Sequence, residues 1–287
     1  MKKDFIQFTQ ESWLHKLENA QVRMSNDNDG VVESSLLRHE KGWETTQFYD
    51  YEVLAQRKGV SSTLPVVAVD CGVTNDTSIH SADNHVGSYS EDSFVNPNAI
   101  NLNLFNQVTP NHYTDKFAMS TTFLTWVSLR KPLPSSEVGK MILIALDGGH
   151  AGYYSDFREQ YLRNLEQLGA KEELLPILEK HTKQDFEQFL VEKLGAGKDK
   201  VHLIMGDGEL WVLEEMYEVY EFISKELGFP VGLPKGDFIT VEEYQKLTGH
   251  IDAIGDLSKR DDIVSWAYVN SRIVSYTKKL KKRKAGA

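Results

Sequence analysis

The chain has 287 residues, which is long for one domain and short for two. Hydrophobic residues make up 40% of it and charged residues 26%, so it can bury a core, and no apolar run reaches the roughly 18 residues of a membrane span. The single cysteine, Cys71, excludes a disulfide framework and a cysteine-based zinc site. The start, MKKDFIQF, lacks the apolar run of a signal peptide, so we expect a cytoplasmic protein without a membrane anchor.

Charge is unevenly distributed along the chain. The net charge is −10, yet the last ten residues, KKLKKRKAGA, hold six basic residues and no acidic one. An acidic body repels nucleic acid in general, although a basic tail could supply local contacts to phosphates. The same lysines could instead close a helix, because cations are favoured at a helix C-terminus.

Residues 1–58 are predicted to form a helical N-terminal segment, followed by an α/β core domain over residues 59–287. Within the first segment, SNDNDG (25–30) breaks a helical pattern, and helices are expected around Trp13–Val22, Val31–His39 and Tyr49–Arg57. The core begins with Leu64–Asp70, whose short unbroken apolar run predicts a buried central strand.

Residues 71–115 form a long polar excursion from this core. The segment is rich in Asn, Asp and Ser, and loops of such length are usually functional or disordered. Ile100–Phe105 alternates within it like an edge strand. Histidines and aspartates that could together bind zinc or manganese also occur there, at spacings that match no known motif: His80, His85, His112, Asp76, Asp83 and Asp92.

The rest of the chain alternates between predicted strands and helices. Strands are expected at Phe117–Leu129, Lys140–Asp147, Lys200–Asp207 and Phe229–Leu233. Helices are expected over 153–194 and 209–228, from a capping box at Thr240-x-x-Glu243, and from about Arg260 to Lys282. Unbroken apolar strands separated by helices predict an α/β fold with a mixed or parallel central sheet and flanking helices.

Three of the predicted strands end in an aspartate with glycine close behind it: Asp70, Asp147 and Asp207. Ligands of α/β sheets bind outside the carboxyl ends of the strands, where parallel neighbours would bring these carboxylates together. Clustered carboxylates need a cation, and oxygen ligands suit Mg²⁺ or Mn²⁺. Such ions can activate water for phosphodiester cleavage. Aspartate also caps helices and glycine turns the chain, so Asp207 could be a cap alone.

Two further residues could join this site. Glu209, two residues beyond Asp207, could add a fourth carboxylate, and His150 could orient a water or accept a proton. We therefore predict metal ligands at Asp70, Asp147, Asp207 and Glu209, and catalytic residues at Asp70, Asp147 and His150.

VVAVDCG and LIALDGG resemble the two Asp-Gly strand ends of the NurA-type nucleases, which have a helical N-terminus and an RNase H-like core. The resemblance implies that fold, nuclease activity, and metal ligation by Asp70 and Asp147. The chain departs from the family's pattern at Cys71, where the family has glycine. It also lacks an obvious glutamate-bearing helix between the two motifs, where Glu137 lies in a turn-like segment.

Two other functions compete with this one. VDCGVTNDTS is similar to the first phosphate loop of the sugar-kinase, Hsp70 and actin superfamily, with LDGGH as the second loop, which implies a phosphotransferase or ATPase. The chain could also be a non-catalytic α/β module that binds a protein partner. The favoured prediction is a metal-dependent nuclease or phosphodiesterase acting on nucleic acid or a small phosphate ester, which could work with a protein partner or as a homo-oligomer.

Overall fold

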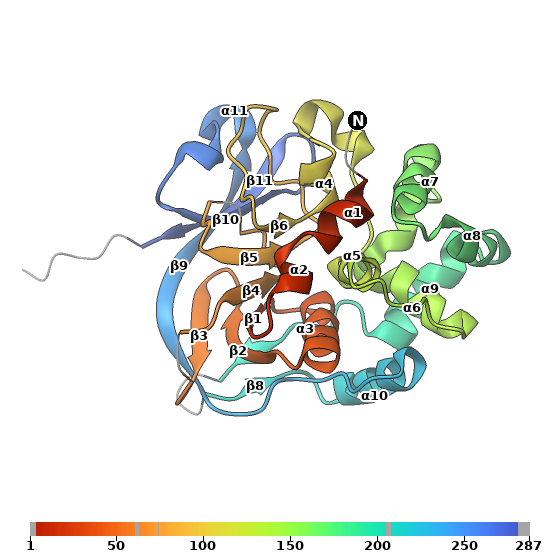
Figure 1. The fold of residues 1–287 in the computed structure, drawn as a ribbon, viewed down its shortest axis with the longest axis horizontal. Coiled ribbons are helices and arrows are strands. Elements are labelled where there is room, and N and C mark those ends of the chain that lie inside the picture. Colours follow the sequence, from red (N-terminus) through yellow and green to blue (C-terminus); the bar gives the residue numbers. More distant parts are fainter. Residues whose placement is uncertain (1–3, 61–62, 74, 205–207, 281–287) are drawn as a thin grey trace, which may run out of the picture.

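The computed structural model describes residues 4–60, 63–73, 75–204 and 208–280 (Figure 1). It is a mixed α/β fold in which nine strands form one curled sheet, in the order β10-β11-β9-β3-β2-β1-β4-β5-β6. These strands are β1 (Gln21–Met24), β2 (Glu44–Tyr49), β3 (Val53–Arg57), β4 (Val66–Val69), β5 (Ile79–Ala82), β6 (Ala99–Ile100), β9 (Phe238–His250), β10 (Ile263–Tyr268) and β11 (Ile273–Lys279). A separate antiparallel pair comprises β7 (His202–Leu203) and β8 (Leu210–Trp211).

The half of the sheet from β2 to β6 is parallel, whereas β3 and the C-terminal strands are antiparallel to their neighbours. The carboxyl ends of β1, β4 and β5 therefore lie at one edge, which is where ligands bind in α/β sheets. The prediction of a buried strand over Leu64–Asp70 is confirmed by β4, whose Val67 and Val69 are fully buried.

Helices flank the sheet (Figure 1). They are α1 (Phe5–Gln10), α2 (Trp13–Lys16), α3 (Asn28–Lys41), α4 (Leu102–Phe105), α5 (Thr121–Ser128), α6 (Glu137–Ala145), α7 (Arg158–Gln167), α8 (Lys171–Lys180), α9 (Lys183–Leu194), α10 (Glu215–Leu227) and α11 (Ile251–Ile254), with 3₁₀ segments at Pro110–Asp115, Leu146–Gly152 and Leu257–Lys259. The helices α3 and α5 contact each other and the parallel strands. None of the described helices is both long and apolar enough to cross a membrane.

The helix α6 lies at the centre of a helical layer beside the sheet, in contact with α8, α9 and α10. Its residues from Met141 to Ala145 are all buried, because neighbouring helices surround it. The strand predicted over Lys140–Asp147 is therefore wrong. An unbroken apolar run fits a fully enclosed helix as well as a central strand, and periodicity cannot separate the two. Ser136 caps this helix through the backbone N–H of Gly139.

The C-terminal strands curl back over the sheet (Figure 1). The 13-residue strand β9 pairs with β3 at one end and with β11 at the other. The edge strand β10 then meets the loops that follow β4 and β5, because Trp266 N–H donates to the carbonyl of Gly72 at 3.3 Å and Tyr268 N–H donates to that of Val86 at 3.0 Å. The hairpin β10–β11 thereby forms a wall over the carboxyl ends of the parallel strands.

Several sequence predictions fail where long-range pairing decides the structure. The capping box at Thr240 and the helix from Arg260 are wrong, since both regions form strands of the sheet. Phe117–Leu129 contains the helix α5 in place of a strand, and Phe229–Leu233 forms no strand. The helices α3 and α10 and the three helices over 153–194 are confirmed.

The two other predicted segments also differ from expectation. Residues 1–58 are not a helical unit, because β1, β2 and β3 lie within them, and β1 pairs directly with β4. The excursion over residues 71–115 contributes β5 and β6 to the same sheet, so it is an ordered part of the fold. The edge strand expected at Ile100–Phe105 is confirmed only at its start, where β6 ends.

Candidate metal centre

Asp70 lies directly after β4, in a left-handed backbone conformation with φ of 53°, and is only 4% exposed. Ser25 Oγ donates to its Oδ2 at 2.9 Å, and Thr121 Oγ1 donates to its Oδ1 at 3.2 Å. These hydroxyls come from the end of β1 and the start of α5. The carboxylate of Asp70 is therefore fixed where three elements meet.

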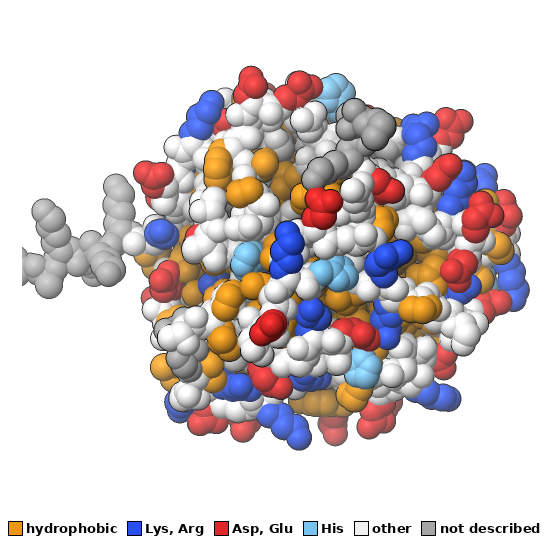
Figure 2. Space-filling model, in the orientation of Figure 1, with side chains coloured by type: hydrophobic (Ala, Val, Ile, Leu, Met, Phe, Trp, Pro, Cys, Tyr) orange, Lys and Arg blue, Asp and Glu red, His pale blue; other side chains and the backbone are white. Residues whose placement is uncertain are grey.

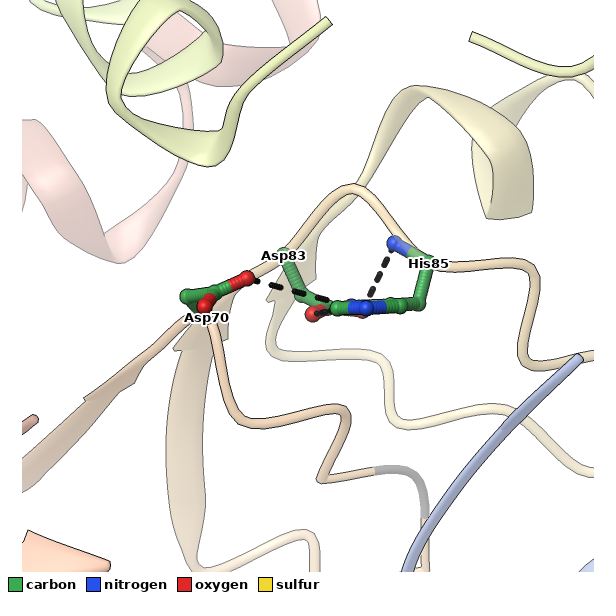
Figure 3. Close-up of side chains that lie close together, drawn as sticks. All are labelled: Asp70, Asp83 and His85. Carbon is green, nitrogen blue, oxygen red and sulfur yellow. Dashed lines mark hydrogen bonds and ion pairs between the residues drawn. The ribbon is translucent and has the colours of Figure 1, made fainter. Parts of the chain in front are cut away.

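Asp83 and His85 follow β5, the strand next to β4. Asp83 accepts hydrogen bonds from the backbone N–H of Gly72 at 3.2 Å and from the side chain of Asn101 at 3.1 Å. His85 Nδ1 lies 2.7 Å from Asp83 Oδ1 and 3.9 Å from Asp70 Oδ1. One ligand atom of each of Asp70, Asp83 and His85 lies within 4.8 Å of the others, and the three side chains converge in Figure 3.

Two more carboxylates follow β1, the partly exposed Asp27 and the buried Asp29. Asp27 caps α3 by accepting from Gly30 N–H at 3.3 Å, and its other oxygen pairs with Lys200 Nζ at 3.0 Å. Asp29 accepts from the backbone N–H groups of Thr121 and Thr122 at 2.6 and 2.9 Å. Asp29 thereby joins the first turn of α3 to the first turn of α5, beside the carboxylate of Asp70.

Asp147, from the helical layer, lies next to the loop that carries Asp83 and His85. It lies after α6 with φ of 55°, and Asn84 Nδ2 donates to its Oδ2 at 3.1 Å. Asn84 stands between Asp83 and His85 in the chain, and it also donates to the carbonyl of Met119 at 2.9 Å. The loop after β5 therefore supplies two potential ligands and holds a third in position.

The charges of these groups act strongly on one another. Burial, together with the charge of Asp147, raises the pKa of Asp29 to about 7. Burial and the charges of Asp27 and Asp29 raise the pKa of Asp70 well above its usual value, and burial also raises that of Asp147. Like charges confined in a buried site oppose ionisation, which is the signature of a site that lacks compensating cations.

The nearby cations do not balance these acids. Burial disfavours the charged form of His85, but the charge and hydrogen bond of Asp83 outweigh it and raise the pKa to about 9. Burial likewise opposes ionisation of Asp27, but its ion pair with Lys200 lowers the pKa of this carboxyl. Five carboxylates thus face one imidazolium and one ammonium group. Carboxylate oxygens with one imidazole nitrogen fit the ligand preference of Mn²⁺ or Mg²⁺.

A sixth acid lies behind the cluster. Glu33 of α3 is fully buried; Thr125 Oγ1 donates to its Oε1 at 2.5 Å, while Oε2 has no hydrogen-bond partner. Burial and the charge of Asp29 raise the pKa of Glu33 well above its usual value. The surroundings of Glu33 therefore favour its neutral form.

Of the predicted site residues that the structure describes, it brings together Asp70 and Asp147. The charge of Asp147 is one of those that raise the pKa of Asp70. Glu209 is exposed next to β8 and is not part of the cluster. His150 is buried, and its ring stacks on Phe186 of α9 at 5.4 Å between centroids, away from the carboxylates. Asp207 lies outside the described residues.

The remaining ligands are not singled out by sequence patterns. Asp27 and Asp29 belong to SNDNDG, which reads as a break in a helix, and Asp83 and His85 belong to a mixed group of histidines and aspartates without a known motif. A signal does exist, since both pairs directly follow a short buried strand, as Asp70 does. The strands QVRM and IHSA are too short and too polar to be identified from their composition.

A cavity of about 560 Å³ opens beside the cluster. Its inner end is lined by Asn84, His85 and Asp147, and its outer walls include the hairpin β10–β11. Residues that hold the cluster together therefore also border a space large enough for a small molecule.

Comparison with known proteins gives no relative: no family model, curated protein or solved structure matches this chain.

Proposed function

We propose that this chain is a metal-dependent phosphoesterase that uses Mg²⁺ or Mn²⁺. The observation that supports it is the convergence of five carboxylates with His85 beside a cavity: Asp29, Asp70 and Asp83 are buried, Asp27 is partly exposed and Asp147 is exposed. Burying acids without compensating cations is costly, and nothing in the packing of the sheet requires it. Such a cost is typical of a site shaped for a ligand.

Each residue has a defined part in this proposal. Asp70, Asp83 and His85 would hold one cation, and Asp27, Asp29 and Asp147 would supply the remaining negative charge around it. Bound divalent ions would neutralise this charge, lower the pKa of a water and polarise a phosphoryl oxygen. Ser25 and Thr121 orient Asp70, and Asn84 orients Asp147.

The phosphotransferase alternative requires free backbone N–H groups in the turn after β4. The N–H of Gly72 instead donates to Asp83 at 3.2 Å and is therefore not free to bind a phosphate. The non-catalytic alternative accounts for the structural bonds of these acids, such as the cap that Asp27 forms on α3, but not for the concentration of carboxylates beside a cavity.

The proposal does not depend on the resemblance to NurA-type nucleases. One of the two motifs behind that resemblance, LIALDGG, is part of the helix α6 and the 3₁₀ segment that follows it. An RNase H-like core, action on nucleic acid, a protein partner, a homo-oligomeric state and a cytoplasmic location all remain predictions of the sequence.

The test is metal binding and cleavage by the full chain. Calorimetric titration with Mn²⁺ should show binding that Asp83→Asn weakens, and bis(p-nitrophenyl) phosphate should be cleaved with Mn²⁺ but not with EDTA. Asp237→Asn is the matched control, because Asp237 is exposed and its ion pair among the described residues is with Lys58. Equal Mn²⁺ affinity in wild type and Asp83→Asn, or cleavage that persists in EDTA, would overturn the proposal.

A further inference from the structure

The cavity beside the metal centre has walls from two parts of the fold. One wall is the face of the C-terminal strands, and the other includes the segment after α6, with Gly148, Ala151 and Gly152. Asp147 and His85 of the candidate metal centre are part of the same lining. A phosphate held beside these two residues would leave the rest of its molecule between the two walls.

The wall formed by the C-terminal strands combines rows of mostly small side chains with the aromatic side chains of Trp266, Tyr268 and Tyr276. Ser265 of β10, Thr277 of β11 and Lys246 of β9 are cross-strand partners, and Ala267 pairs with Ser275 in the next row on the same face. Side chains two residues apart on a strand share a face, so these residues form one continuous surface. Its small residues leave room that larger ones would fill.

Two lysines line the cavity without acidic partners. Lys246 Nζ lies 4.7 Å from the ring centroid of Tyr51, and Lys116 Nζ lies 4.9 Å from that of Tyr113. Across the described part of the chain, no carboxylate lies within ion-pair distance of either ammonium group, although the protein is acidic. Both tyrosines line the cavity as well, and Tyr51 O–H donates to the backbone carbonyl of Asp70 at 3.1 Å.

We infer that this cavity binds the nucleoside part of a small nucleotide phosphate ester, with the phosphate at the metal centre. This inference rests on the proposed function and names its substrate class. The volume of about 560 Å³ falls within the range of small-molecule sites. The two lysines attract the anion, and the aromatic side chains of the lining offer apolar surface to a base.

A long nucleic-acid strand fits these walls poorly. Strand-binding grooves combine stacking with a basic track along the backbone. The described lining of the cavity contains only two lysines. On the face of the molecule shown in Figure 2, acidic and basic side chains are interspersed. The substrate is therefore a mononucleotide ester or a very short oligonucleotide.

The experiment compares substrates and variants of the full Mn²⁺-loaded chain. The p-nitrophenyl ester of thymidine 5′-monophosphate is the test substrate, and a labelled single strand of about 20 nucleotides is the competitor class. Binding of thymidine 5′-monophosphate is measured separately by calorimetry. Ala267→Trp fills the cavity, and Lys246→Met removes one charge while keeping an aliphatic stem.

Both variants should raise KM for the mononucleotide ester and Kd for thymidine 5′-monophosphate by about tenfold or more. The matched controls, Val241→Trp and Lys279→Met, replace exposed residues of the same sheet outside the cavity and should change neither value. If Ala267→Trp does not fold, Lys246→Met decides the matter.

The outcomes separate this inference from the proposed function. Cleavage of the ester with KM and Kd unchanged in both cavity variants, or faster cleavage of the long strand, would overturn the inference and leave the phosphoesterase intact. If the protein cleaves no ester but the cavity variants bind thymidine 5′-monophosphate more weakly, the inferred nucleotide site would stand and the phosphoesterase proposal would be overturned.

Discussion

The imidazole of His85 bridges two carboxylates that belong to different strands, at 2.7 Å from Asp83 and 3.9 Å from Asp70. Asp83 also binds the backbone N–H of Gly72, two residues beyond Asp70. The ends of β4 and β5 are thereby tied together through the same side chains that could hold a cation. The same side chains hold the strand ends together and are proposed to bind a cation, so stability and metal binding can be measured separately in variants.

Asp70→Asn should abolish turnover without unfolding the protein. The amide keeps an acceptor for Ser25 or Thr121 and removes one charge from a crowded site, so the melting temperature in EDTA should stay the same or rise. The value of kcat on bis(p-nitrophenyl) phosphate should fall on the order of 10²-fold or more. A variant with full activity and a lowered melting temperature would assign Asp70 to the fold alone.

The metal-free protein should lose stability as pH rises. Burial raises the pKa of Asp29 from 3.8 to about 7, so the folded state binds more protons than the unfolded state between these values. Stability conferred by the protonated form is present at low pH and is lost as pH approaches about 7. Asp70 and Glu33 act in the same direction.

Added Mn²⁺ should reverse this dependence, because it binds the ionised carboxylates. Melting temperatures recorded between pH 5 and 8, in EDTA and in Mn²⁺, test the prediction. His85 acts in the same direction, because its pKa is raised from 6.5 to about 9 and the stability that it confers is lost progressively as pH rises through this interval. A metal-free stability that rises from pH 5 to 7 would contradict the account.

Gly30→Ala should disturb the candidate metal centre, because the added methyl group would clash with Ser25. A Cβ at this position would lie 2.1 Å from Ser25 Oγ and 3.0 Å from its backbone nitrogen, so the hydroxyl that orients Asp70 must move. We expect a loss of about 1–3 kcal/mol in the free energy of unfolding, measured by urea titration, with weaker Mn²⁺ binding. Gly232→Ala is the control, since nothing lies within 4 Å of the position that its Cβ would take. Equal stability of the two variants would show that Ser25 adapts freely.

Lys200→Met should tighten Mn²⁺ binding. Lys200 pairs with Asp27 at 3.0 Å and competes with an added cation for that carboxylate. Because its side chain is 53% exposed, the loss of the pair should cost no more than about 1 kcal/mol of stability. Lys198→Met, which breaks an exposed pair with Glu215, serves as the control in the same calorimetric titration. Weaker Mn²⁺ binding in Lys200→Met would instead make this lysine a support for the site.

The sequence by itself determined those features that depend on local pattern. The unbroken apolar run before Asp70 identified β4, and capping residues and glycines bounded α9, where Thr182 and Gly195 stand at the two ends. The polar composition of residues 71–115 marked a segment with potential ligands, and Asp83 and His85 of the metal centre come from it.

Only the tertiary structure decided the rest. The apolar run in α6 is enclosed by helices, and the polar residues of β9 form a strand because β3 and β11 supply hydrogen-bonding partners on both sides. The candidate metal centre depends on the same long-range contacts. Parallel pairing of β1, β4 and β5 places residues 27, 70 and 83 at one edge, and packing of α6 adds Asp147. No local pattern encodes such convergence, because the energy of a buried charge depends on neighbours that are distant in the chain.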